Sequence, residues 1–255
     1  MAVVDETLEI APYNPSGWQV FIKTILGLVV GVFIAFLIFI ILVLIGGMIQ
    51  QALSDKLAGV TSANPLLPLI LIIVGFIGTF IGTLIIAGIF NLLYPDKYYD
   101  MGKMFSLTLL MNVLTLVLFV PLYLIFSDNI DQLFIVLAFH TLFSIFLSYT
   151  AVEISTNPNY AAVHLIGTAA GILVAFFVFA VAYKFIDVNQ GNTARIIMVL
   201  PPVIAYLFLP LFHSAWEKVY YKFYSMGNNF FYIPSLNEVM VDEEEADDVK
   251  VDTDV

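Results

Sequence analysis

Residues 65–93 form an uncharged run longer than a bilayer crossing, and this run constrains the fold more than any other stretch of the chain. About 20 apolar residues, each rising about 1.5 Å, cross the hydrocarbon core of a membrane as a helix. The run also contains Gly75, Gly78, Gly82 and Gly88. In lipid, small residues four positions apart allow a second helix to approach closely. We therefore predict a membrane-spanning helix with a glycine face against its neighbours.

The composition of the whole chain agrees with a membrane protein. Of its 255 residues, 61% are hydrophobic and 11% are charged, whereas about a quarter of the residues in a soluble domain are charged. The formal net charge is −11, and residues 242–255, with eight acidic residues and one lysine, account for −7 of it. The chain has no cysteine, which excludes disulfides, thiol nucleophiles and thiolate metal sites.

Five further apolar runs predict additional helices. Their approximate ranges are 24–49, 104–126, 132–152, 161–184 and 195–212. The last range is the shortest and the least regular, because it contains three prolines, and proline removes a backbone hydrogen bond from a helix. The fold class we predict is all-α, a polytopic integral membrane helix bundle with about six transmembrane helices over residues 18–212.

The segments that flank this transmembrane domain differ in composition. Residues 1–17 are polar and acidic, which is typical of a loosely ordered arm. In residues 213–233, aromatic side chains recur at helical spacing with charged residues beside them, which predicts a separate helix lying in the membrane interface. We expect the acidic tail of residues 234–255 to be disordered.

The distribution of basic residues predicts the orientation in the membrane. With six crossings, both termini lie on one side. That side carries Lys23, Lys97, Lys103, Lys218 and Lys222, and the opposite side carries Lys56, Lys184 and Arg195. The positive-inside rule then predicts that both termini lie in the cytoplasm. The expected location is a cell (plasma or inner) membrane.

Small residues at four-residue spacing occur in three of the predicted helices. In lipid, such faces allow close packing between helices. The predicted packing residues are Gly27, Gly31, Gly75, Gly78, Gly82, Gly167 and Gly171.

A polar seam is predicted between the third and fourth helices. The connection at 127–131 is so short that these helices are antiparallel neighbours, which places Asn112 and Ser144 at the same depth. The candidate seam residues are Asn112, Thr115, His140, Ser144 and Ser148. The seam is either a path for a proton or small solute or a set of hydrogen bonds worth about 0.6 kcal/mol each, and the sequence favours the second interpretation.

The remaining ionisable residues of the helices give no recognisable site by their spacing. Glu153 lies at the end of the fourth predicted helix, where we expect it to face the membrane interface. His164 and His213 lie near helix ends, and neither has a second histidine three or four residues away, nor does the chain offer a cysteine. We therefore predict no metal site, no cofactor and no catalytic residue.

The functional prediction rests on the small-residue faces of three helices, the near absence of charge within the spans and the placement of both long polar segments on one side of the membrane. Motifs of metalloproteases, α/β-hydrolases, P-loop proteins and dinucleotide-binding proteins are missing. Asp96 and Asp100 could serve metal-assisted phosphate chemistry, but their lysine and tyrosine neighbours favour a loop at headgroup level. The sequence favours a non-catalytic scaffold or subunit of a membrane complex with a cytoplasmic acidic tail; the alternative is a small-solute or proton transporter or channel using the seam. The expected partners are the lipid bilayer and another protein or a second copy, and not nucleic acid.

Overall fold

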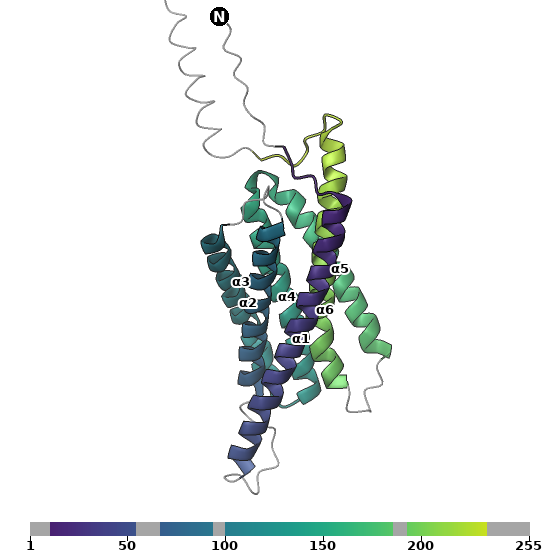
Figure 1. The fold of residues 1–255 in the computed structure, drawn as a ribbon. Coiled ribbons are helices and arrows are strands. Elements are labelled where there is room, and N and C mark those ends of the chain that lie inside the picture. The colour runs from purple at the N-terminus through teal and green to yellow at the C-terminus, as the bar shows by residue number, and fades with distance from the viewer. Residues whose placement is uncertain (1–10, 55–66, 94–99, 186–192, 234–255) are drawn as a thin grey trace, which may run out of the picture.

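A computed structural model describes residues 11–54, 67–93, 100–185 and 193–233, and all regular structure in this part of the chain is helical (Figure 1). The elements are α1 (Gly17–Ser54), α2 (Leu67–Leu93), α3 (Met101–Ile125), α4 (Ile130–Thr156), the 3-10 turn η1 (Pro158–Tyr160), α5 (Ala161–Phe185) and α6 (Thr193–Tyr224). Six helical segments among these residues are long and apolar enough to cross a membrane. The protein is an all-α integral membrane helix bundle.

Large apolar side chains stand on the outside of this bundle as well as inside it. Phe33 and Phe36 of α1, Val117 of α3 and Phe177 of α5 are all exposed. A helix that is apolar on every face is stable when lipid, rather than water, surrounds it. The outward faces of these helices are therefore the lipid-contacting surface.

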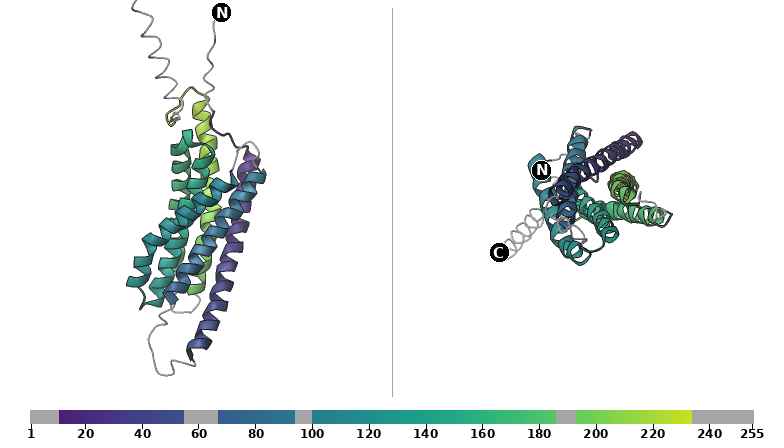
Figure 2. Two further views of the ribbon diagram at one scale, coloured as in Figure 1. Left: turned by 90° about the vertical axis from the view of Figure 1, so that its left-hand side faces the viewer. Right: turned by 90° about the horizontal axis from the view of Figure 1, so that it is seen from below.

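Two helices, α4 and α6, form the centre of the arrangement. Helix α6 packs against α1, α4 and α5, and α4 packs against α2, α3, α5 and α6. The view along the bundle shows α6 between α1 and α5 (Figure 2). Polar side chains that point inward from α4 and α6 are consequently enclosed by other helices on most sides.

Side-chain caps and a short turn set the ends of α3, α4 and α5. The carboxylate of Asp100 accepts hydrogen bonds from the backbone amides of Gly102 and Lys103, at 2.8 and 3.1 Å, and so caps α3. The side chain of Asn129 accepts from the amide of Gln132 at 3.1 Å and caps α4. At the other end of α4 the turn η1 leads directly into α5. The C-terminal end of α4 and the N-terminal end of α5 are therefore held together.

Glycines bring α1 and α6 into backbone contact. A methyl group at Gly27 would overlap the carbonyl oxygen of Tyr206. That carbonyl has no helical amide donor, because residue 210 is proline. One Cα–H of Gly27 points at this oxygen and partly replaces the missing donor. At Gly31, a methyl group would lie 2.8 Å from the carbonyl oxygen of Pro202.

The other glycines of the predicted packing faces also meet neighbouring helices. Gly75 faces Leu137 and His140, Gly78 faces Ile38, Gly82 faces Ile34 and Tyr206, Gly167 faces His213 and Trp216, and Gly171 faces Phe208 and Leu209. Gly88 differs, because a methyl group there would meet open space. The small-residue faces are thus occupied by helices of the same chain.

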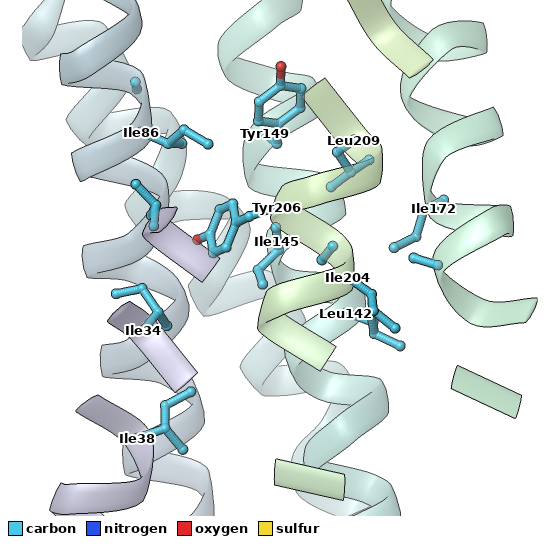
Figure 3. Packing of buried hydrophobic residues seen from close by; sticks show 14 of the residues in the cluster. Ile34, Ile38, Ile86, Leu142, Ile145, Tyr149, Ile172, Ile204, Tyr206 and Leu209 are labelled. Carbon is cyan, nitrogen blue, oxygen red and sulfur yellow. The ribbon is translucent and has the colours of Figure 1, made fainter. Parts of the chain in front are cut away.

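The apolar core lies between α1, α2, α4, α5 and α6 (Figure 3). Ile34, Ile145 and Tyr206 are fully buried in it. The Tyr206 hydroxyl lies 3.1 Å from Thr83 Oγ1 and donates to the carbonyl oxygen of Thr79 at 3.3 Å. Tyr206 therefore ties α6 to α2 through the core.

Two predicted boundaries need correction. The separate interfacial helix predicted for residues 213–233 is absent, because α6 continues from Thr193 to Tyr224 without a break at 212 and residues 225–233 are not helical. Trp216 and Tyr220 pack on other helices rather than on lipid headgroups, and Tyr220 is buried. Helix α1 starts at Gly17, inside the predicted arm. The first ten residues of that arm and the predicted acidic tail over 234–255 lie outside the described residues.

Candidate functional site

Helix α4 carries polar residues into two separate buried groups. The first, which we call the polar seam, consists of Thr79, Asn112, Ser144 and Ser148, from α2, α3 and α4. The second, which we call the ionisable cluster, consists of Lys23, Glu153, His164, His213 and Glu217, from α1, α4, α5 and α6. All members of both groups are buried.

Asn112 is the centre of the polar seam. Its Oδ1 lies 2.6 Å from the hydroxyls of both Thr79 and Ser144, which donate to it. Its Nδ2 donates to the Ser148 hydroxyl and to the carbonyl oxygen of Thr108, each at 2.8 Å. A side-chain amide has two donors and two acceptor positions, and all four are used here. The seam is a neutral and fully hydrogen-bonded junction of three helices.

The structure separates the other two predicted seam residues from Asn112. The Thr115 hydroxyl donates to the carbonyl oxygen of Met111 in its own helix, at 2.7 Å. His140 Nδ1 lies 3.2 Å from the Tyr123 hydroxyl, and its ring stacks on Phe119. Both residues are buried, but neither has a hydrogen bond to the Asn112 side chain among the described residues.

Thr79 was not among the seam residues predicted from sequence. The available signal was its position beside Gly78, in the glycine face of the second predicted helix. Close approach through that face allows the short Thr79 side chain to reach α3 and α4.

The ionisable cluster lies near the ends of four helices. Lys23 is in the second turn of α1, Glu153 in the last turn of α4 and His164 in the first turn of α5. His213 and Glu217 are four residues apart on α6 and therefore share one face of it. The turn η1 places Glu153 and His164 side by side, and α6 brings its two residues against them.

The side chains of the cluster form a continuous chain of contacts. Lys23 Nζ donates to Glu153 Oε1 at 2.9 Å, and the same oxygen lies 3.8 Å from His213 Nδ1. On the other side of the ring, His213 Nε2 lies 2.8 Å from His164 Nδ1. Glu217 Oε1 lies 3.6 Å from His213 Nε2 and 3.7 Å from His164 Nδ1.

Aromatic residues surround the cluster. Lys23 Nζ lies 4.8 Å from the centre of the Phe90 ring, and the Tyr149 ring meets His213 edge-on. Tyr160 and Tyr220 contact each other one helical turn farther toward the helix ends. All five ionisable residues are at most 2% exposed. Removing charges from water in this way is costly, and ionisable residues inside membrane spans mark functional sites by default.

The ionisable cluster overturns two expectations from sequence. Glu153 does not face the membrane interface, because it is 1% exposed and paired with Lys23. His164 and His213 are direct neighbours, although no spacing rule connects them. Spacing rules describe ligands on a single helix, whereas these residues come from different helices. The available signal was that all of them lie close to the ends of predicted helices on the same side of the membrane.

Glu153, His164, His213 and Glu217 together offer the atoms that bind metal ions. One ligand atom from each lies within 4.8 Å of the others. The prediction of no metal site rested on spacing along the chain, so this grouping removes its basis. No protein-family description, curated protein or solved structure gives a significant match to this chain.

Proposed function

We propose that this protein is a transporter-class membrane protein that binds a small cation within its helix bundle. The observation that supports this proposal is the ionisable cluster, in which side chains from four helices meet at one buried position. Buried ionisable residues that face the interior of a membrane bundle are typical of substrate and ion pathways.

The charge of the cluster favours a positively charged ligand. With both imidazoles neutral, it holds the carboxylates of Glu153 and Glu217 and the ammonium of Lys23, which gives a net charge of −1. Lys23 is bonded to Glu153, so the excess negative charge lies at Glu217 beside the two imidazoles. A buried charge is stabilised by an opposite charge at close range. A cation between Glu217 and the histidines supplies it.

The polar seam is a less suitable site for a transported ion. It contains no ionisable group, and every hydrogen-bonding position of Asn112 is used by protein atoms. The transport path that the sequence suggested through the seam would have to break this network. We therefore assign the seam to helix packing and the ionisable cluster to ligand binding.

Two of the three premises of the scaffold hypothesis concern the charge within the spans and the glycine faces. Charge was expected to be nearly absent from the spans, but Lys23, Glu153 and Glu217 are buried within them. The glycine faces were expected to pack against neighbouring helices, and the helices that they contact belong to the same chain. A protein partner or second copy is still part of the proposal, but the glycine faces no longer argue for it.

We further propose that both termini, and with them the ionisable cluster, are on the cytoplasmic side. Burial of Lys23 in an ion pair removes it from the near-membrane charges available to the cytoplasm, and this weakens the lysine bias. The chain has no cysteine, so single cysteines at Ser16 and Asn129 can be labelled without background. Labelling of Ser16→Cys from inside and Asn129→Cys from outside is the expected result.

Cation flux into vesicles tests the proposed function. Purified protein in liposomes is assayed for uptake of protons, sodium, magnesium, manganese and zinc with trapped indicators. We expect uptake of at least one cation above protein-free vesicles, and we expect the variant Glu217→Gln to lose it. The matched control is Ser148→Ala in the polar seam, which should retain it. No flux of any of these cations by the wild-type protein would contradict the proposal.

A further inference from the structure

We propose that His164, His213 and Glu217 form a three-ligand site for a divalent transition-metal ion, for which zinc is the probe. This inference rests on the proposed function, because it names the class of cation that the ionisable cluster takes. The ligand atoms are His164 Nδ1, His213 Nε2 and Glu217 Oε1, from α5 and α6.

The three atoms have the right separation for one ion to contact them all. They form a triangle with sides of 2.8, 3.6 and 3.7 Å. The radius of the circle through its corners is the product of the sides divided by four times the area, which is about 2.0 Å here and equals the length of a zinc–nitrogen or zinc–oxygen bond. One ion placed among the three atoms would therefore be within reach of all three ligands.

The ligand types restrict the class of metal. Two imidazoles and one carboxylate suit zinc and neighbouring transition metals. Magnesium and calcium prefer oxygen ligands throughout and are disfavoured by the two nitrogens. Three protein ligands also leave a fourth position open, as in sites where a metal exchanges its ligands rather than only stabilising a fold.

Glu153 and Lys23 form the support for this site. Glu153 Oε1 lies 3.8 Å from His213 Nδ1, on the side of the ring opposite the proposed metal ligand Nε2. At this distance the carboxylate acts through its negative charge, which favours the proton on Nδ1 and leaves the lone pair of Nε2 for the metal. Lys23 fixes the same carboxylate oxygen at 2.9 Å. Both residues are therefore positioning residues for His213.

The alternative to a metal site is a plain hydrogen bond between the two imidazoles. The distance of 2.8 Å between His164 Nδ1 and His213 Nε2 fits such a bond. It does not by itself explain why the Glu217 carboxylate approaches both of the same two nitrogens. With a metal bound, each nitrogen and the carboxylate oxygen contact the ion instead of one another.

Calorimetry and X-ray absorption on the purified full-length protein test this site. Zinc alone is titrated into the metal-free protein, and the zinc absorption edge of the loaded protein is recorded. We expect one ion per chain, two imidazole ligands and one carboxylate oxygen. No zinc binding, or bound zinc with fewer than two imidazoles, overturns the site. This measurement uses the wild-type chain, so it does not depend on any variant folding.

Variants assign the residues. Glu217→Gln should lower zinc affinity at least 100-fold, whereas His140→Gln, which changes a buried histidine outside the cluster, should leave it unchanged. The double variant Lys23→Met, Glu153→Gln removes both charges of the supporting pair and should lower affinity about 10–100-fold while two imidazoles remain bound. Unchanged affinity in the double variant would contradict the positioning role.

The outcomes separate this inference from the proposed function. If these ligands bind zinc but the protein shows no flux of any cation in vesicles, the transporter function is contradicted and the metal site is supported. Flux of another cation by a protein that binds no zinc retains the transporter function and removes the site.

Discussion

The polar seam and the ionisable cluster both use α4, but they differ in how their polar atoms are satisfied. At Asn112, both amide hydrogens and both acceptor positions of the side chain are used by neutral groups of the protein. Around His213, two nitrogens and a carboxylate oxygen converge on one point, and the charges do not cancel when the imidazoles are neutral. The first arrangement holds helices together, whereas the second, on our proposal, is balanced by the charge of a bound cation. Burial of polar residues alone does not distinguish a structural group from a binding site. The distinction we draw depends on whether the donors, acceptors and charges of the group balance one another.

The largest effect is expected from breaking the ion pair in the cluster. Lys23→Met leaves the Glu153 carboxylate without its ammonium partner in a residue that is 1% exposed. Removing one member of a buried pair typically costs about 3–5 kcal/mol. Unfolding of the purified protein in detergent measures the change. The double variant Lys23→Met, Glu153→Gln should recover part of the loss, and a double variant less stable than the single one would show that the pair is not coupled.

A smaller loss of stability is expected from a substitution at Gly82, where α2 packs closely on α1. The position of α2 also places Thr79 in the polar seam. Leucine at Gly82 would collide with Ile34 and with the Tyr206 hydroxyl. Overpacking of this kind typically costs about 1–3 kcal/mol. Gly88→Leu is the matched control, because open space surrounds that position. Equal thermal stability of the two variants in detergent would mean that this face does not hold α2 in place.

Within the seam, the cost should be smaller again. Asn112→Val removes four hydrogen bonds and leaves the hydroxyls of Thr79, Ser144 and Ser148 to find other partners. Hydrogen bonds between membrane helices average about 0.6 kcal/mol, so four amount to about 2.4 kcal/mol. Because the freed hydroxyls can form other hydrogen bonds, we expect a loss of about 1–2 kcal/mol for this variant and about 0.6 kcal/mol for Ser144→Ala. Chemical unfolding in mixed micelles provides the measurement. A loss above that of Lys23→Met would reverse the proposed ranking of the two groups.

The smallest effect is expected at His140. Its ring stacks on Phe119, and its Nδ1 lies 3.2 Å from the Tyr123 hydroxyl. Phenylalanine has a similar shape, so His140→Phe should cost less than about 1 kcal/mol and leave cation flux unchanged. Vesicle flux and detergent stability measured on the same preparation check both parts. Loss of flux with the fold intact would return the transport path to the third and fourth helices.

The helices and the depth of the seam could be predicted from sequence because both depend on local patterns. Apolar runs give the spans, and the short connection at 127–131 places Asn112 level with Ser144, whose side chains are hydrogen-bonded at 2.6 Å. The continuation of α6 past residue 212 was missed, because Trp216 and Tyr220 look equally suited to a membrane interface and to a buried helix face. The distinction depends on the neighbours, α5 and η1, that cover them.

Apart from His213 and Glu217, which are four residues apart on α6, the ionisable cluster could not be predicted because its contacts join distant parts of the chain. His164 and His213 are 49 residues apart, and Lys23 and Glu153 are 130 residues apart. A lone histidine or glutamate near a helix end is ordinary in sequence and becomes unusual only when α6 inserts between α1 and α5. The predicted order of the spans places these residues on one side of the membrane. Which helices are neighbours depends on packing, which the sequence pattern does not indicate.

The effect of zinc on stability tests the central distinction most directly. A ligand that binds only the folded protein stabilises it by about 2.7 kcal/mol at 100 times its dissociation constant. We predict that zinc stabilises the wild-type protein and Asn112→Val by the same increment, although Asn112→Val is less stable without zinc, and that Glu217→Gln loses the increment. No stabilisation of the wild-type protein by zinc, or an equal increment in Glu217→Gln, would contradict the assignment of the ionisable cluster as the binding site.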